Sequence, residues 1–345
     1  MELLALDSAF APVAYLKYFN LQWTRRYYEC GEFSVQIRAA DYQSAMAYVY
    51  TRDRPETGII QKVEYAASLK GEFVQLSGFF LESMLNDKIV YPTFYGRGNL
   101  ETAARELVTA YKDDIPLLRL GGISGVGSSV TWQETGGQMA DVLYETLQTQ
   151  ELSFRCRYSL EDDAVYYEVW QGLDRTQPQT ANNPVTFSRT FRNLSGANIA
   201  TDVSNAKNFA VVAGSGEEAG RIVAEVDLSE GGYKRKLYVD QRNLSYDPGE
   251  QTLDEYREEL RQKGREKLLK YVGSFNADVD AVDGGGFVYL RDYDLGDKCD
   301  VIVDSVSLSL EARIIAVYEV VKQGRRTVSL ELGDKVLTPY DKARL

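Results

Sequence analysis

Two periodicities alternate along this chain, and their order limits its fold more than any other feature. Most of the sequence follows a strand pattern, in which β-branched and aromatic residues alternate with polar ones or form short runs. Segments of this kind are Leu3–Leu6, Tyr15–Trp23, Glu32–Ile37, Ile59–Tyr65, Phe73–Phe80, Leu152–Ser159, Ala164–Trp170, 205–240 and Phe287–Leu332. Because they lie at both ends of the chain, we expect a β-rich domain at each end.

A helical spacing of apolar residues interrupts this pattern in three places. Asn99 is a suitable N-cap for a helix that continues to Tyr111. A shorter helix is expected over Gln138–Leu147. The third begins at Thr252, which has the spacing of a capping box with Glu255. These segments predict α+β inserts between the β-rich ends.

Two distant segments share a layout. Ile59–Gly78 and Ile314–Gly333 each open with Ile-Ile, contain a glycine turn and end in a strand before a glycine. Any two β-hairpins could be this similar, but the match favours two related β domains.

The fold class predicted from these patterns is α+β, mainly β, with two β-barrel-like domains and α+β insert domains between them. A chain of 345 residues also exceeds what one hydrophobic core usually organises. The expected units are 1–92 for the first β-barrel domain, 93–204 for an α+β insert, 205–240 with 291–338 for a discontinuous second β-barrel domain, and 241–290 for a helix-containing insert.

Composition excludes several kinds of catalysis. The sequence contains no histidine, so neither a Ser-His-Asp nor a Cys-His nucleophile can form, nor a His-ligated zinc site. Its cysteines, Cys30, Cys156 and Cys299, are odd in number and widely spaced, which favours reduced, buried thiols. We therefore expect no enzyme activity, no cofactor and no metal.

Charge and hydropathy limit the partners. The net charge of −12 argues against a nucleic-acid-binding surface, because phosphate contacts need clustered Lys and Arg. It would suit either a lining past which DNA slides or simple solubility. No apolar run is long enough to span a bilayer, and the N-terminus lacks the features of a signal peptide. We expect no stable membrane association.

Four local motifs have alternative interpretations. The glycine clusters Val211–Gly220 and Gly121–Ser129 imitate phosphate-binding loops, but strands follow both, so we interpret them as a hairpin turn and a flexible loop. The acidic stretch 276–280 resembles a calcium loop but has Ala281 at the required glycine position. Trp23–Tyr28 could stack on a sugar or a base, and a strand with one aromatic and one charged face explains it as well.

Three longer stretches carry a family resemblance. They are Gly172–Arg221, Lys234–Ser245 and Arg291–Lys335, and the segments Tyr28–Ala39 and Gly58–Val63 fit the same pattern. Together they resemble the ReqiPepy-type siphophage tail protein family, whose members are baseplate or tail-tip hub subunits. The family is related to the hub of contractile-tailed phages and to the N-terminal part of tail-associated lysins. Cys299 departs from the small aliphatic or polar residue more common at its position.

The resemblance implies a structural subunit of a phage-type tail. Its two β-barrel-like domains would be hub domains, and a homotrimer would form a pseudo-six-fold ring. Such a ring adapts the six-fold tail to three-fold tip proteins. Expected partners are further copies of the chain, the distal tail protein ring, the tape-measure protein, and a tail fibre, spike or receptor-binding protein, with DNA only in transit through the channel. The expected location is the tail tip or baseplate of the virion, after assembly in the bacterial host cytoplasm.

Several residues in the resembling stretches have expected structural roles. Leu295 would anchor a core, Gly296 would permit a tight turn, and Asp297 could accept hydrogen bonds from backbone amides. Asp174 and Arg175 would end a strand and pair with each other, and Asp292 belongs to the same motif. Candidate interface residues are Trp23, Arg25, Arg26 and Tyr27.

Two other functions stay open. The first is a tail-associated cell-wall hydrolase; related lysins carry the lytic domain as a C-terminal extension, for which we expect no room before Leu345. The second is a carbohydrate-binding adhesin using Trp23, Trp132 or Trp170, although contacts between subunits use aromatic residues in the same way.

Overall fold

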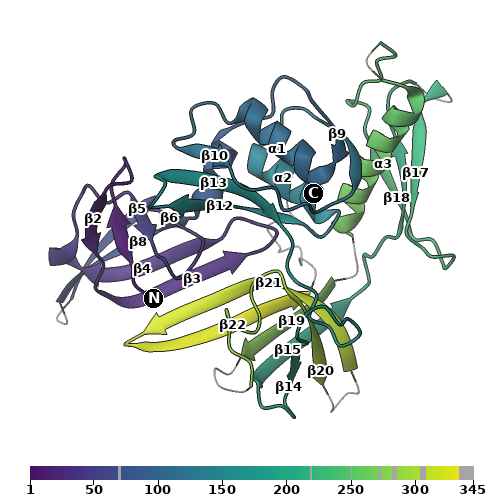
Figure 1. Ribbon diagram of the computed structural model, residues 1–345. Helices are drawn as coiled ribbons and strands as arrows, with labels where there is room; N and C mark the ends of the chain where they lie inside the picture. Colours follow the sequence, from purple (N-terminus) through teal and green to yellow (C-terminus); the bar gives the residue numbers. More distant parts are fainter. Residues whose placement is uncertain are drawn as a thin grey trace.

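A long antiparallel sheet runs through the centre of the protein. The computed structural model describes residues 1–68, 71–217, 220–249, 251–271, 274–281, 286–303 and 308–333. The sheet has the strand order β15-β19-β22-β21-β3-β4-β8-β7. Its strands are β3 (Tyr18–Arg26), β4 (Glu32–Arg38), β7 (Lys62–Ser68), β8 (Gly71–Phe79), β15 (Leu194–Asp202), β19 (Ser274–Ala281), β21 (Leu308–Lys322) and β22 (Arg325–Gly333). In Figure 1 the purple β3 and the yellow β21, from opposite ends of the sequence, run side by side.

The two halves of this sheet have the same topology. When the four strands of each half are numbered in chain order, the spatial order is 1-2-4-3 in both. The third and fourth strands of each half form a two-residue hairpin, with Ser68 opposite Gly71 in one and Lys322 opposite Arg325 in the other. The segments 59–78 and 314–333, which look alike in sequence, contain these two hairpins.

A smaller sheet covers one face of the N-terminal half. It has the order β2-β1-β5-β6 and consists of β1 (Leu4–Leu6), β2 (Pro12–Tyr15), β5 (Tyr48–Tyr50) and β6 (Gly58–Ile59). Over most of β3, β4 and β8, buried apolar side chains alternate with exposed or half-buried polar ones, so the buried apolar ones meet the small sheet. The resulting core includes Leu3, Ala5, Leu21, Trp23, Phe33, Val35, Ile37, Val74 and Leu76.

A second layer of strands also covers the apolar face of the C-terminal half. β20 (Lys298–Val303) pairs with the first part of β21, and β14 (Thr186–Ser188) pairs with β20. The core between these strands and the large sheet includes Tyr27, Phe187, Tyr289, Tyr293, Leu295, Val301, Ile314, Val317, Leu330 and Leu332.

An α+β unit packs above the junction of the two halves (Figure 1). It contains the short helix η2 (Leu81–Asp87), the helices α1 (Leu100–Tyr111) and α2 (Met139–Gln148), and the strands β9 (Phe94–Asn99), β10 (Leu118–Leu120), β11 (Ser129–Glu134), β12 (Ser153–Ser159) and β13 (Ala164–Trp170). Asn99 caps α1 by accepting a hydrogen bond from the Thr102 amide, as its sequence position predicted. The buried faces of both helices and of these strands form one core.

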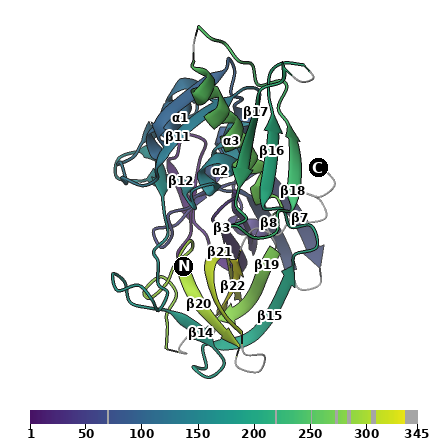
Figure 2. The ribbon, with the colours of Figure 1, turned by 90° about the vertical axis from the view of Figure 1, so that its right-hand side faces the viewer.

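A further unit combines three strands with the third helix. β16 (Phe209–Ala213), β17 (Val223–Asp227) and β18 (Lys236–Asp240) form a sheet that packs against α3 (Leu253–Leu269), as Figure 2 shows. The capping box of Thr252 and Glu255 is present, as predicted. None of the helices in the described ranges is long and apolar enough to cross a membrane.

This grouping differs from the one expected from the sequence. Strands β16–β18 do not join 291–338 in a second barrel, because their apolar side chains are buried against Tyr256 and Leu260 of α3. The segment 274–281, expected in the helical insert, is a strand of the large sheet. The prediction of a mainly β fold with helices is confirmed. The predicted barrels are open sheets in the single chain, since no sheet closes on itself among the strands described.

Candidate functional site

One face of the large sheet is mainly polar, with Phe73, Phe79, Tyr318 and Val320 among its described side chains. The side chains that point away from the two cores lie on this face, which we call the polar face. Its centre carries hydroxyl and amide side chains that are exposed or half-buried: Asn20, Gln22, Ser34, Gln36, Gln75, Ser77, Thr327 and Ser329. Around them lie charged residues of both signs: Arg26, Glu32, Arg38, Lys62, Glu64, Lys322, Arg325 and Glu331.

Neighbouring strands are linked across this face by side-chain hydrogen bonds. The Gln75 amide donates to the Ser34 hydroxyl at 2.7 Å, and the Asn20 amide donates to Gln36 Oε1 at 2.7 Å. Their polar atoms are therefore partly satisfied by each other. Among the described side chains of this face the cations are interspersed with carboxylates, amides and hydroxyls, although Lys322 and Arg325 lie opposite each other.

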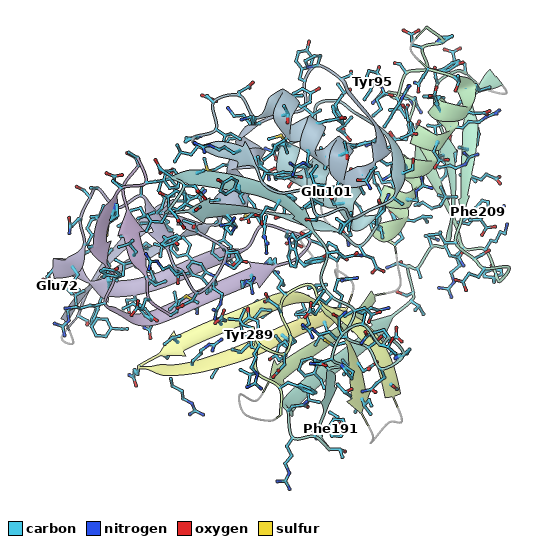
Figure 3. All side chains as sticks on the ribbon, viewed as in Figure 1. Glu72, Tyr95, Glu101, Phe191, Phe209 and Tyr289 are labelled. Carbon is cyan, nitrogen blue, oxygen red and sulfur yellow. The ribbon has the colours of Figure 1, made fainter. Side chains whose placement is uncertain are left out.

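A buried arginine joins the two halves on the opposite face. Arg25 on β3 is 2% exposed and forms ion pairs with Glu56 at 2.8 Å and with Asp294 at 2.5 Å. It also donates to the Tyr289 hydroxyl at 2.6 Å, and Figure 3 labels Tyr289 at this junction. Burial raises the pKa of Tyr289 well above its ordinary value, so its hydroxyl stays protonated as the acceptor.

A second ion pair crosses the same junction. Arg54 donates from Nε and Nη2 to the two carboxylate oxygens of Glu319, both at 2.6 Å. Arg326 of β22 adds a contact to Glu319 at 2.9 Å. The guanidinium groups of Arg54 and Arg326 lie 5.4 and 5.6 Å from the ring centre of Tyr289. A buried pair of this kind adds little net stability, but loss of one partner leaves an uncompensated buried charge, so both partners must be present at the junction.

A tight turn holds the chain that enters β20. Gly296 has φ +83°, which favours glycine, and the Cβ of any other residue would lie 2.5 Å from the Tyr27 ring. Leu295 is buried in the adjacent core. Asp297 accepts hydrogen bonds from the amides of Leu173 and Asp294, at 2.8 and 3.0 Å. The turn thereby connects segments that are more than 100 residues apart in sequence.

The expected Asp174–Arg175 pair is replaced by other contacts. Arg175 forms its ion pair with Asp297 at 2.7 Å, whereas Asp174 accepts from the amide and hydroxyl of Thr176. Neither residue lies in a strand: Asp174 forms an isolated bridge with Lys298 and caps its own turn at Thr176. Asp292 caps the neighbouring turn by accepting from the Val288 amide at 2.7 Å, and the hydrogen bond from Arg291 lowers its pKa.

The interface predicted at Trp23, Arg25, Arg26 and Tyr27 is wrong for three of its four residues. Trp23 and Tyr27 are fully buried, and Arg25 is buried in the ion pairs described above. The cause is that β3 is a central strand, paired with β4 on one side and β21 on the other. Only Arg26 is partly exposed, on the polar face, where its guanidinium lies 5.8 Å from the ring centre of Tyr318.

The tryptophans considered for sugar binding are mostly interior. Trp23 and Trp132 are buried in two different cores. Trp170 is half-buried between the Tyr27 ring and the guanidinium of Arg155. Neither Trp23 nor Trp132 can stack on a ligand without unfolding its core, so of the three tryptophans only the half-buried Trp170 still supports the adhesin hypothesis.

The remaining motifs have structural roles where they are described. The Val211–Gly220 cluster begins in β16 and leads into the turn before β17, an antiparallel partner, as the hairpin interpretation predicted. In the Gly121–Ser129 loop, the amides of Ser124, Gly125 and Val126 donate to the buried carboxylate of Glu101, labelled in Figure 3. Among the residues with described side chains, no group of acidic residues and cysteines is arranged to hold a metal ion.

Glu82 should make stability depend on pH. It is 4% exposed, and burial raises its pKa to about 7, while a hydrogen bond from the Cys156 amide opposes part of this rise. A carboxyl group with a raised pKa contributes its full stability below its ordinary pKa of 4.5 and loses it as pH rises to about 7. Between pH 4 and pH 8, Glu82→Gln should therefore gain about 3 kcal/mol in free energy of unfolding relative to the wild type.

Urea denaturation at a series of pH values measures this effect, and Glu145→Gln, on an exposed side chain, is the control. Some pH dependence should remain in Glu82→Gln, because the pKa of Glu259 is also raised by burial, to about 7. An unchanged difference between Glu82→Gln and the wild type across this range would contradict the assignment.

Comparison with solved structures places this architecture among phage tail proteins. The chain is similar to the tail protein from Neisseria meningitidis MC58, with a TM-score of 0.62 and 14% identity over 97% of this chain and 96% of the other. It is also similar to the prophage tail protein gp18 from Listeria monocytogenes EGD-e, with a TM-score of 0.61 and 11% identity over 99% and 98% of the two chains. A third match is the 43 kDa tail protein of prophage MuSo2 from Shewanella oneidensis, with a TM-score of 0.58 and 14% identity over 96% and 98%.

The sequence itself identifies the family. The chain belongs to the family of Siphovirus ReqiPepy6 Gp37-like proteins, whose model matches residues 7–334. This match confirms the resemblance seen in the three stretches of sequence. No curated protein gives a significant match.

Proposed function

We propose that this chain is a structural hub subunit at the tail tip or baseplate of a phage-type tail. In this role it forms a homotrimeric ring that adapts the six-fold tail to three-fold tip proteins and surrounds the channel for DNA and the tape-measure protein. The observation that carries the proposal is the repeat within the sheet: two four-stranded halves with the same strand order, joined edge to edge. Three such chains supply six similar halves, which is what an adaptor between six-fold and three-fold partners requires.

The polar face fits the inside of such a ring. The small covering sheet, β14 and β20 pack on the apolar face of the large sheet. In a closed ring the outer layer has the larger circumference, so the covered face belongs outside and the polar face lines the channel. The large open sheet of each chain, with its two halves, would then become one third of a closed barrel, which has no free edges.

The size of this barrel suits the passage of DNA. Eight strands from each of three copies make 24. With strands ~4.8 Å apart and tilted by ~40°, the backbone radius is about 24 Å, which leaves a channel roughly 35 to 40 Å wide inside the side chains. A DNA duplex passes through such an opening.

The chemistry of the polar face supports transit instead of binding. Its centre is uncharged, and the described charges around it are five basic and three acidic residues, in a protein whose net charge as a whole is −12. DNA that passes would exchange few counterions and adhere weakly. The distal tail protein ring would lie on one side and a tail fibre, spike or receptor-binding protein on the other. In this proposal the subunit works by assembly in the virion, without catalysis or a cofactor.

The mass of the purified protein in solution tests the ring. We expect a species of three times the 38.8 kDa chain mass by size-exclusion chromatography with light scattering, and its proportion should rise with protein concentration. Addition of the neighbouring ring protein should stabilise the trimer. A monomer at every concentration, with and without that neighbour, would contradict the proposal and favour a hydrolase or an adhesin.

A further inference from the structure

The large sheet ends in two strands that each lack a second partner within the described part of the chain. β7 pairs with β8, and β15 pairs with β19; they are the first and last strands of the order given above. An unpaired edge presents a row of backbone N–H and C=O groups that can pair with another chain. The two edges lie at opposite ends of the sheet, so one copy cannot join them to each other.

The edge strand β7 carries apolar side chains of the kind found on strands that are covered by a neighbouring strand. All seven residues of β7 are exposed. Val63 and Tyr65 lie opposite Leu76 and Val74 of β8, which are buried in the N-terminal core, so they extend its apolar face to the edge. They are 45% and 61% exposed. Burying them against the next strand of a neighbouring copy would remove this apolar surface from water.

The repeat shows how such a partner would pair. Within the chain, strand 3 of the C-terminal half (β21) pairs with strand 1 of the N-terminal half (β3). The corresponding strands at the free edges are β7, which is strand 3 of its half, and β15, which is strand 1. We propose that β7 of one copy pairs with β15 of the next, in the way that β21 pairs with β3. This inference rests on the proposed ring and adds its contact and register.

The register follows from the strand pairings of the two halves. The hairpins align Ser68 with Lys322, so β7 and β8 correspond to residues 254 positions later. Phe79 of β8 therefore corresponds to Gly333 of β22. Because Glu32 pairs with Phe79 and Asn276 pairs with Gly333, β4 and β19 correspond with a shift of 244 residues. In the same way, Thr24 pairs with Glu32 and Ala200 pairs with Asn276, so β3 and β15 correspond with a shift of 176 residues.

A β-bulge supports this alignment independently. The register of β3 with β4 shifts between Tyr18 and Asn20. The register of β15 with β19 shifts between Leu194 and Gly196, the positions that a shift of 176 predicts. Bulges fix register within a fold, so their agreement indicates that the two halves share a backbone design.

The internal junction then predicts the external one residue by residue. Ala316 opposite Arg26 becomes Lys62 opposite Asp202, and Lys322 opposite Asn20 becomes Ser68 opposite Gly196. The seven predicted positions of β7 are the whole of that strand, Lys62–Ser68. The predicted partners in β15 are residues 196–202, the part of that strand that follows its bulge. The contact is head to tail, and repetition around three copies closes the ring.

Cysteine cross-linking tests this register. Residues 66 and 198 lie opposite each other in the predicted pairing, and Ala66 is small and exposed. On mild oxidation, Ala66→Cys/Asn198→Cys should form disulfide-linked dimers and trimers. The shifted pair Ala66→Cys/Ala200→Cys should cross-link at least tenfold less, because diagonal positions in a sheet are too far apart for good disulfide geometry.

Two controls locate the contact. Gln22→Cys/Val320→Cys occupies the corresponding positions of the internal junction, so it should form a disulfide within one chain without adding mass. A mixture of chains with Ala66→Cys alone and chains with Asn198→Cys alone should give linked dimers only. That result shows that the contact is between copies.

Each alternative result has a distinct meaning. Two results would show that the register is wrong while the ring remains, provided that the trimer forms. In one, the shifted pair cross-links to the same extent as the predicted pair; in the other, only the internal control forms a disulfide. If the protein stays monomeric and no variant links between chains, both the register and the ring of the proposed function are wrong.

Discussion

Replacement of Arg25 by alanine is expected to lower the free energy of unfolding by about 4 kcal/mol. The guanidinium is buried at the junction of β3 and β21 and is paired with Glu56 and Asp294. Its removal leaves the Glu56 carboxylate, which is 7% exposed, without its cation. Breaking one side of a buried pair typically costs 3–5 kcal/mol for this reason, more than the pair itself contributes.

Urea denaturation followed by circular dichroism measures this loss. Arg257→Ala is the matched control, because Arg257 pairs with Asp254 on the exposed side of α3 and its loss should cost less than about 1 kcal/mol. Glu56→Gln should be destabilising alone but should recover part of the loss in the Arg25→Ala background, because it removes the carboxylate that Arg25→Ala leaves unpaired. A loss below about 1 kcal/mol for Arg25→Ala would show that the junction does not depend on this residue.

Replacement of Gly172 by alanine should have a comparable effect, about 3 kcal/mol or more. A Cβ at this position would lie 1.9 Å from the carbonyl oxygen of Gly296, and backbone atoms cannot rotate out of the way as a side chain can. The turn at Gly296 and Asp297 would have to move, and with it the hydrogen bond from the Leu173 amide to Asp297. The C-terminal core should therefore loosen.

Thermal unfolding distinguishes this effect from a general cost of alanine. At Gly122 a Cβ would meet no atom within 4 Å, so Gly122→Ala should melt within about a degree or two of the wild type. Gly172→Ala should melt at least several degrees lower. Equal melting temperatures for the two variants would mean that the turn adjusts without strain.

Local features were predictable from the sequence because local residues determine them. The cap at Asn99 and the capping box at Thr252 depend on side chains within three residues of each other. The strand at Trp23 was visible in its β-branched and aromatic composition. The two hairpins that end at Phe79 and Gly333 were indicated by a similar layout of apolar and turn residues, but the sequence match, Ile59 with Ile314, is one residue out of the structural correspondence of Ser68 with Lys322.

Long-range pairing was not predictable in the same way. Arg25 looked like an interface residue because nothing near it in sequence shows that Glu56 and Asp294 lie beside it. The assignment of β16–β18 to the second β domain failed because a strand pattern does not specify its partner, and here α3 covers that sheet. The repeat was only half visible, since the first two strands of each half share a bulge but no obvious sequence pattern.

Single-particle electron microscopy of the assembled protein tests the central claim most directly. The account predicts a closed ring with three-fold symmetry, six similar β units around it, and a channel lined by the face that carries Gln36 and Gln75. A ring with that face turned outward, or an assembly in which the two halves of each chain do not alternate around the channel, would contradict it.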